Sequence, residues 1–457
     1  MAQYNKKIQE YLPQAKTLFE VVMLADKDGN PVSPNSGVSV EFSGASADAF
    51  GRGRVSQPFT LADYKHTYGD AKDFLTYSVD GGSISFPQNK ANVLLQTSNL
   101  ATSRVVHQSK LYHHYLPGKS QLIFNSFCFN DGDLSCKKRI GYYDDNNGIF
   151  FEKEIDDLGN IQLKLVIRSN VTGSVVDKEI LQENWSVDKC DGTGDSGFSL
   201  DVDKTQLFFV DFQWLGVGRI RCGFIHDGIS ILCHEELHSN NTSEVYWSNP
   251  NLPIRAELLN TAVNNGASLQ AICATVICEG GYIEAGIDWE VQNSSVKATQ
   301  TPGGTWTPIM ALRLKNTFKG SPNRILFNPE AVGIYADLKA VSFKIGKLPS
   351  ASSLSAGVPL VWNDVNADSG VEYCTNATSV NLADFEAFGG GFVSSGVAQG
   401  SQNSASPNDL VKSKRNIITQ NYDSTDSEVY VIIVRTLSTG VNDYANIWAS
   451  LQWKEIL

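Results

Sequence analysis

The chain has 457 residues, of which 42% are hydrophobic and only 19% are charged. Globular proteins average about 25% charged residues, and in this chain small polar residues and 38 glycines take their place. The 49 acidic and 37 basic residues leave a net charge of −12, which argues against general binding to nucleic-acid phosphates or to anionic membranes. The composition favours strands and tight turns over helices.

The sequence shows no targeting or membrane segment. No apolar run approaches the roughly 18–20 residues of a spanning helix, and the first residues, MAQYNKKIQEYLPQ, are too polar for a signal-peptide core. We therefore expect a soluble protein that is made in a cytoplasm and does not insert into a membrane.

The first segment is expected to be helical. Apolar residues such as Ile8, Leu12 and Leu18 recur at helical spacing within residues 4–25, with an interruption at Pro13. We place the end of this N-terminal arm at residue 35. An exposed helical arm would serve in attachment to a larger assembly, and a helix packed on its own domain is the alternative.

Residues 36–319 are predicted to form a large β-sandwich or barrel. Short runs of β-branched and aromatic residues, several with alternating polarity, follow one another at short intervals. Turn sequences rich in Asn, Asp and Gly separate them. Representative strands and turns are Ser120–Phe127, Gly148–Glu152, Gln162–Arg168, Gln206–Phe212, Asp145–Gly148, Asp157–Asn160, Asn170–Gly173 and His226–Gly228.

Residues 320–457 are predicted to form a smaller C-terminal β domain. Its last strands are expected at Glu428–Arg435 and Ala445–Trp453. Residues 385–410, which contain three consecutive glycines and a run rich in Ser, Asn and Gln, are expected to form a flexible loop.

The eight cysteines are scattered, and several lie within strand-like runs. Small buried thiols are the favoured interpretation, with disulfides or metal ligands as the alternatives.

One segment matches a zinc-peptidase motif. His234-Glu235-Glu236-Leu237-His238 fits H-E-x-x-H, and Glu257 is a possible third ligand. That chemistry needs a helix, whereas the surrounding sequence predicts a strand, on which histidines four apart lie roughly 13 Å from each other. A chance match is therefore favoured. The Asp-rich stretch 188–197 is similarly better explained by turn formation than by calcium binding.

No catalytic serine motif, dinucleotide motif or P-loop is present. We therefore assign no catalytic residue, metal ligand or cofactor.

Two sets of residues are candidates for a ligand or partner surface. Tyr142, Tyr143 and Trp247 adjoin Asn- and Asp-containing turns, where exposed aromatic rings could stack on sugars; packing in the core is the alternative. Arg219 and Arg221 are two apart and are expected to share one face of a strand, where they could clamp a carboxylate of a neighbouring strand or subunit. An ion pair within the domain is the alternative. Gly216 and Gly218 indicate a bulge or a close backbone approach.

A family resemblance rests on six segments, which cover about a third of the chain: Leu116–Ser120, Arg139–Asp144, Asn147–Phe151, Asp203–Gln206, Asp211–Arg221 and Asn249–Arg255. Together they resemble a group of virion structural proteins of tailed bacteriophages, including aquatic cyanophages, and the stretch around Trp214 is the most specific. The order of the motifs, with a Trp214–Arg219 strand, also resembles a concanavalin-type jelly roll. In that group we expect a Phe-like residue at the position of His238, which further weakens a zinc site. The resemblance implies a particle component without an assigned reaction.

We therefore expect a mainly β protein with a large jelly-roll-like sandwich, an N-terminal helical arm and a smaller C-terminal β domain. The expected function is that of a non-enzymatic virion structural protein, assembled in the host cytoplasm, in the tail, baseplate or a fibre. Its expected partners are other virion proteins, copies of itself and a host-surface glycan. A capsid decoration or head-fibre protein is the alternative, and a zinc peptidase or glycan-degrading enzyme is a less favoured one.

Overall fold

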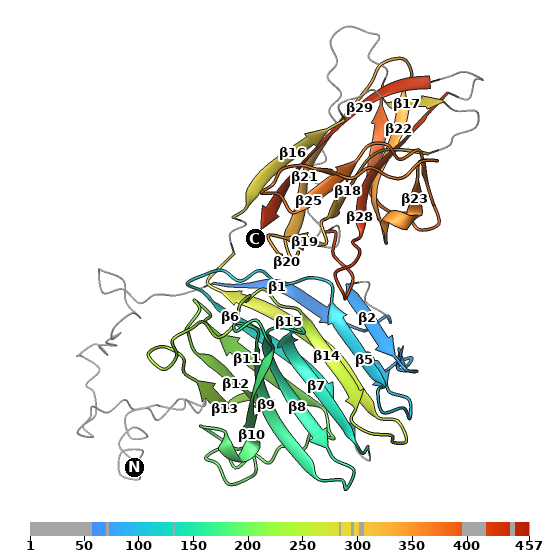
Figure 1. Ribbon diagram of the computed structural model, residues 1–457. Helices are drawn as coiled ribbons and strands as arrows, with labels where there is room; N and C mark the ends of the chain where they lie inside the picture. The colour runs from blue at the N-terminus through green and yellow to red at the C-terminus, as the bar shows by residue number, and fades with distance from the viewer. Residues whose placement is uncertain are drawn as a thin grey trace, which may run out of the picture. The chain divides into compact units, whose positions relative to one another are not determined.

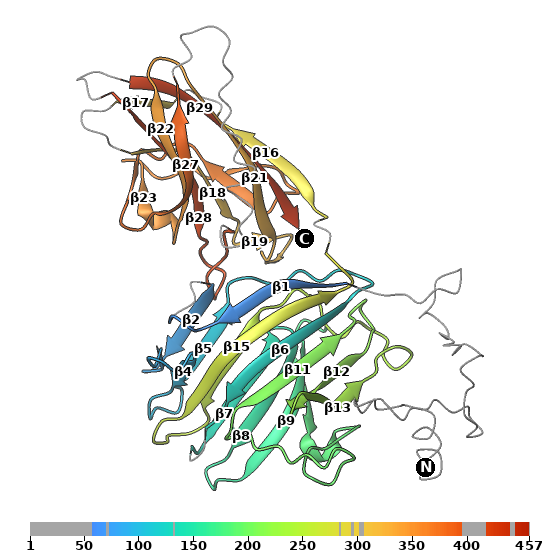
Figure 2. The same cartoon turned by 180° about the vertical axis from the view of Figure 1, so that it is seen from behind.

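The computed structural model describes residues 57–69, 73–130, 133–282, 285–293, 297–300, 306–394, 417–438 and 444–456. The predicted arm at residues 1–35 lies outside the described residues. Gln57–Leu457 form one compact unit, and within it the described residues fold into two β-sandwiches (Figures 1 and 2). The prediction of a mainly β protein is confirmed. Among the described residues, no helix has the length and apolarity to cross a membrane.

The first sandwich consists of an eight-stranded and a seven-stranded antiparallel sheet. The eight-stranded sheet has the order β13 (Ile229–Glu236), β12 (Ile220–His226), β11 (Gln206–Phe212), β6 (Ser120–Cys128), β15 (Ser268–Glu279), β4 (Val93–Gln96) and β3 (Ser83–Ser85), with β1 (Pro58–Lys65) also paired to β15. The seven-stranded sheet has the order β10 (Val176–Leu181), β9 (Ile161–Ser169), β8 (Gly148–Ile155), β7 (Cys136–Tyr143), β14 (Ile254–Asn260), β5 (Arg104–Ser109) and β2 (Phe74–Val79). A short 3₁₀ turn, η2 (Gln182–Asn184), follows β10.

The chain passes repeatedly from one sheet to the other, for example from β5 to β6, from β6 to β7 and from β10 to β11. This is the connectivity of a jelly-roll-like sandwich. The alternating residues of the strands fill the space between the sheets, as Ile123 and Phe127 do on β6 and Phe208, Val210 and Phe212 do on β11. The odd and even residues of each strand therefore face the core and the outside in turn.

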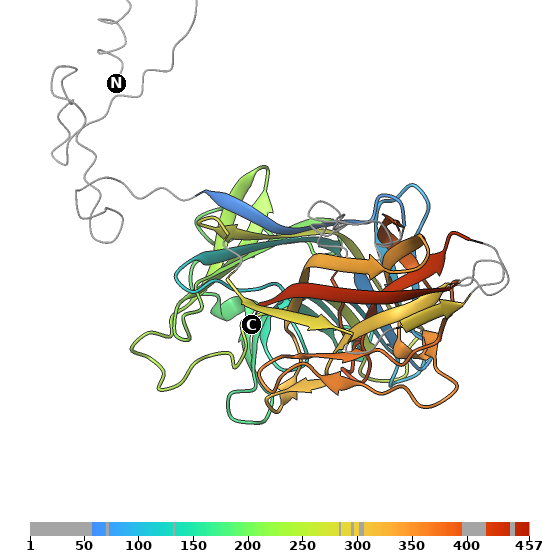
Figure 3. The same ribbon diagram turned by 90° about the horizontal axis from the view of Figure 1, so that it is seen from above.

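The second sandwich packs a four-stranded sheet against a six-stranded one, and Figure 3 shows its long C-terminal strand in red beside two yellow strands. The four-stranded sheet contains β16 (Ile287–Gln292), β29 (Tyr444–Ile456), β17 (Lys297–Gln300) and β21 (Leu326–Ala336). The six-stranded sheet has the order β24 (Asn363–Asp364), β25 (Val371–Cys374), β18 (Thr307–Leu314), β28 (Val429–Thr436), β22 (Val341–Leu348) and β27 (Glu386–Val393). The remaining elements are β19 (Thr317–Phe318), β20 (Ser321–Pro322), β23 (Leu354–Ser355), β26 (Ser379–Val380) and η3 (Ala351–Ser353).

The boundary predicted between residues 319 and 320 differs from the sheet pairing. Strands β16, β17 and β18 precede residue 320, yet they pair with β28 and β29 at the end of the chain. The last strand of the first sandwich is therefore β15, which ends at Glu279. Strand sequences reveal periodicity but not the partner with which each strand pairs.

The flexible loop predicted for residues 385–410 is wrong over its first part. Residues 386–393 form β27, whose glycines pair with β22: Gly390 lies opposite Lys344, and a Cβ atom on Gly390 would lie 2.6 Å from Phe343 O. The three glycines thus permit a close backbone approach. Residues 395–410 lie outside the described residues.

Candidate functional site

The three aromatic residues predicted to form a sugar-binding surface are buried, with Tyr142, Tyr143 and Trp247 each 0% exposed. The expectation that they are exposed is therefore wrong. Tyr142 and Trp247 face the core of the sandwich, where the Trp247 ring packs edge-on against Phe212 at 5.1 Å. The alternative, packing in the core, accounts for both residues.

Tyr143 lies on the outer face of the seven-stranded sheet, but charged side chains cover it. Its hydroxyl donates to Glu257 Oε2 at 3.1 Å, and the guanidinium of Arg255 lies over its ring, 5.0 Å from the centroid. Arg255 Nη2 also contacts Glu257 Oε2 at 3.2 Å. Arg255 and Glu257 are 0% and 1% exposed, so this part of the face is closed.

The same closed region, hereafter the buried ion network, extends across four adjacent strands. Arg139 on β7 contacts Glu152 on β8 at 2.5 Å and Glu257 on β14 at 3.7 Å, while Arg104 reaches Glu257 from β5 at 2.7 Å. Burial alone would raise the pKa of Glu257, but Arg255, Arg139 and Arg104 outweigh burial and hold that pKa well below its ordinary value. Glu257 is thus a fixed carboxylate and not a proton donor at neutral pH.

The residues of the zinc-like motif are used structurally. His234 lies on β13, as the predicted strand requires, and its Nδ1 accepts a hydrogen bond from Ser186 N at 3.2 Å. His238 Nδ1 donates to Gly218 O at 2.8 Å, and Glu257 belongs to the opposite sheet. Within the described part of the chain, no three His, Cys, Asp or Glu residues are grouped so that they could hold a metal ion.

The Asp-rich stretch at residues 188–197 is a loop organised by its own hydrogen bonds. The Asp188 carboxylate accepts from Cys190 N at 2.8 Å and from Ser196 N at 2.9 Å. Burial alone would raise the pKa of Asp188, but these bonds outweigh it and lower that pKa. Turn formation therefore explains the position of this aspartate.

Arg219 and Arg221 line a pocket of about 320 Å³ on the outer face of the eight-stranded sheet, here called the arginine pocket. The pocket spans one end of four neighbouring strands: β12, β11, β6 and β15. On these strands, Ile220, Cys222 and Cys278 point into the core, so the alternating residues between and beside them point outward. The pocket is lined by Gly118, Lys119, Ser120, Asp211, Gln213, Arg219, Arg221 and Glu279.

Both arginines form ion pairs within the sandwich, as the alternative interpretation of the sequence predicted. Arg221 is bound to Asp211 on the neighbouring strand β11, and Arg219 Nη1 contacts Glu235 Oε1 at 2.8 Å. The arginine side chains are 52% exposed for Arg219 and 39% for Arg221. Each guanidinium carries five N–H donors, so the solvent-facing donors can bind a further acceptor.

The other side of the arginine pocket offers a cation and a second carboxylate. Lys119 Nζ donates to Gly281 O at 2.8 Å, and Ser120 Oγ donates to Glu279 Oε2 at 2.7 Å. The lining thus holds three cationic and two anionic side chains and no aromatic ring. Such a site suits a polar ligand with hydroxyl groups and a negative charge, because Arg binds carboxylates through paired charge-assisted hydrogen bonds.

The sequence pattern indicates the two arginines of the pocket but not Lys119, Asp211 and Glu279. Asp211 carries a usable signal, because it is the one charged residue of the strand Gln206–Phe212 and lies at an outward position. Glu279 carries no such signal, because it reaches the pocket only through the pairing of β15 with β6, in which it lies opposite Ser120.

The stretch Trp214–Arg219 is a turn between β11 and β12, and its prediction as a strand is wrong. Gly216 has a φ of 81°, which favours glycine, and a Cβ on Gly218 would lie 1.7 Å from Gln213 O. The predicted close backbone approach is confirmed. This turn holds Arg219 at the rim of the pocket.

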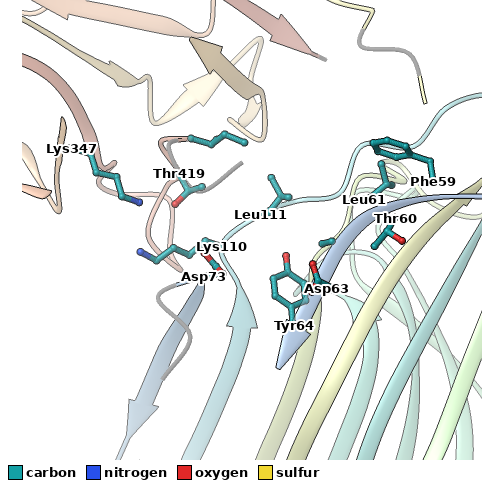
Figure 4. A pocket seen from close by; sticks show the side chains of 12 residues that line it. Phe59, Thr60, Leu61, Asp63, Tyr64, Asp73, Lys110, Leu111, Lys347 and Thr419 are labelled. Atoms are coloured by element: carbon teal, nitrogen blue, oxygen red, sulfur yellow. The ribbon is translucent and has the colours of Figure 1, made fainter. Parts of the chain in front are cut away.

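A second pocket, of about 390 Å³, is shown in Figure 4. Phe59, Leu61 and Leu111 supply apolar surface, and Lys110 and Lys347 lie at its polar side. Both lysines contact Glu428 Oε1, at 2.8 and 3.1 Å. Asp63 and Asp73 also line this pocket, so its carboxylates, together with Glu428, outnumber the two ammonium groups and make it a poorer site for an anion than the arginine pocket.

Comparisons with known proteins show distant likenesses of fold. No protein-family model matches the sequence, and no curated protein matches it. Many solved structures resemble about half of the chain, and three examples are the CBM2 module of an evolved Dit protein of Lactobacillus casei BL23 phage J-1, the carbohydrate recognition domain of Emp47p, and a Bacillus licheniformis β-glucanase.

For these three structures in turn, the sequence identities are 7%, 13% and 10%, and the TM-scores are 0.33, 0.30 and 0.29. The matches cover 50%, 49% and 50% of this chain and 100%, 95% and 99% of the other chains. Likenesses this distant do not assign a ligand or a reaction.

Proposed function

We propose that this protein is a structural component of a tailed-phage particle, located in the tail or baseplate, whose first sandwich binds an acidic carbohydrate of the host surface. The observation that carries this proposal is the arginine pocket, in which Lys119, Arg219 and Arg221 gather on a chain of net charge −12. Seven of its eight lining residues fall in the segments Leu116–Ser120 and Asp211–Arg221, which resemble phage virion proteins.

The chemistry of the pocket suggests how the ligand is held. A sugar carboxylate would receive N–H donors from Arg219 and Arg221, and sugar hydroxyls would donate to Asp211 and Glu279. Because the lining contains no aromatic ring, recognition would rest on charge and hydrogen bonds and would weaken with added salt.

Binding of a uronic-acid polysaccharide, with neutral dextran as the comparison, tests this site on the full chain. We expect binding to polygalacturonate only, and a loss of at least about tenfold in affinity for a variant carrying Arg219→Ala and Arg221→Ala. Lys178→Ala is the matched control, because Lys178 forms an ion pair with Glu236 at 2.8 Å on the same sandwich but outside the pocket. Equal affinity of the double variant and the control would contradict the proposal.

Immunogold labelling of whole particles tests the location. Label at the tail tip or baseplate is the expected result, with several copies per particle arranged around other virion proteins. Label confined to the head would favour the alternative, a capsid decoration or head-fibre protein, and purified particles without label would overturn the virion role.

A further inference from the structure

Two cysteines meet inside the first sandwich. The Sγ atoms of Cys190 and Cys233 lie 3.2 Å apart, although the residues are 43 positions apart in the sequence. Both side chains are 0% exposed. A disulfide bond is about 2.05 Å long, so the two sulfur atoms would have to approach by a further ~1.1 Å to form one.

The backbone around the two cysteines fixes their approach. Cys233 lies on β13, and its carbonyl oxygen accepts from Val187 N at 3.0 Å and Asp188 N at 3.2 Å, in the segment that leads to Cys190. On the other side, Leu200 N donates to Cys190 O at 2.8 Å. Cys190 itself has a φ of 52°, a conformation that turns the loop at this residue. Several backbone hydrogen bonds therefore hold the two cysteines next to each other.

We propose that Cys190 and Cys233 are a disulfide-forming pair, which joins the loop between η2 and β11 to strand β13. The bond would form once the protein leaves the reducing compartment in which it is made, because disulfides persist in oxidising surroundings. This timing rests on the proposed virion role, whereas the pairing itself rests on the sulfur contact alone.

The reaction is thiol–disulfide exchange with a low-molecular-weight disulfide such as oxidised glutathione. One cysteine, as the thiolate, attacks a glutathione sulfur, breaks the glutathione S–S bond and releases one glutathione, which takes up a proton. The second cysteine loses its proton and attacks the protein sulfur of the mixed disulfide, forming the Cys190–Cys233 bond and releasing the second glutathione. Two electrons pass from the protein to the oxidant.

Burial makes this reaction slow. The hydrogen bond with Cys190, together with burial, raises the pKa of the Cys233 thiol, so little thiolate is present in the closed structure. Exchange therefore needs local opening of the loop, and the bond should resist reduction equally well once it has formed.

The full chain, incubated with oxidised glutathione and then denatured and alkylated, tests the proposal by peptide mass mapping. We expect a peptide linked through Cys190 and Cys233, the loss of the alkyl label from both residues, and a rise in Tm of about 5–10 °C that prolonged incubation with dithiothreitol reverses. Cys190→Ser and Cys233→Ser should each abolish the link and the rise in Tm.

Cys222→Ser is the matched control, because Cys222 is equally buried and lies on the neighbouring strand β12, opposite His234. It should leave the linked peptide unchanged. Wild-type protein in which Cys190 and Cys233 are both still alkylated after prolonged incubation, or which forms a bond through Cys222 in place of Cys190, would overturn the proposal without bearing on carbohydrate binding.

Discussion

Arg255 and Glu257 show that a side chain can point away from the core of a sandwich and still be buried. They are two apart on β14, and both point away from the core, which Ile254, Ala256 and Leu258 enter. Both are nevertheless fully buried: Arg104 and Arg139 of the neighbouring strands contact Glu257, and Tyr422, from outside the sheet, contacts Arg255. A sequence pattern predicts the side of a sheet but not what covers it, and the same limit explains the wrong expectation for Tyr143.

The buried ion network should be costly to break at a single residue. We expect Arg255→Met to lower the free energy of unfolding by about 3 kcal/mol or more, because Glu257 would stay charged and buried with one cation fewer. Lys178→Ala, which removes an exposed ion pair, should change it by at most about 1 kcal/mol. Urea unfolding of both variants measures the difference, and equal losses would show that the network contributes no more than a surface pair.

At the scale of elements, the sequence predicts strands and turns well, but not their partners. The strand predicted at Gln206–Phe212 has the bounds of β11, and Asp145–Gly148 forms the turn from β7 to β8. In contrast, β16, β17 and β18 pair with strands at the end of the chain. The boundary between the sandwiches therefore follows β15 and does not lie between residues 319 and 320 as predicted. Pairing depends on side-chain packing between distant segments, for which alternating polarity carries no information.

The turn between β11 and β12 is an element on which the arginine pocket depends. We expect Gly218→Ala to lower the free energy of unfolding by roughly 1–3 kcal/mol and to weaken polysaccharide binding, because its Cβ would overlap Gln213 O and shift Arg219. Gly228→Ala, in the next hairpin, is the control: its φ of 78° is strained for alanine, but no atom lies within 4 Å of the added Cβ. Thermal unfolding and polysaccharide binding of both variants test this prediction. Unchanged binding by Gly218→Ala would show that the arginine pocket does not depend on the conformation of this turn.

At the scale of the whole molecule, titratable groups that are wholly or partly buried make the fold sensitive to acid. In the first sandwich, a hydrogen bond with His234 lowers the pKa of Glu236 to about 2, and in the second, Lys110 and Lys347 outweigh the effect of burial and lower that of Glu428. Carboxylates of this kind stabilise the folded state above the pKa of the unfolded chain, near 4.5, and lose that contribution as the pH falls toward the folded value.

Two buried histidines should make the fold less stable at a higher pH than the carboxylates do. Burial lowers the pKa of His66 to about 4, and burial together with the neighbouring His66 lowers that of His107 to about 3. The unfolded chain takes up these protons near pH 6.5 and the folded chain does not, so stability is full above about pH 6.5 and falls as the pH drops toward 4. His107 alone would give a slope of up to about 1.4 kcal/mol per pH unit.

His107→Phe tests the histidine contribution, because the His107 ring stacks on Phe74 at 4.3 Å and a phenyl ring can occupy the same place without titrating. We expect urea unfolding of the wild type at pH 7, 6, 5 and 4.5 to show falling stability, and the variant to show a smaller fall over the same range. Part of the loss below pH 4.5 should persist in the variant, because the carboxylates and His66 still contribute to it. An identical slope between pH 6 and 4.5 in both proteins would show that His107 does not govern acid sensitivity.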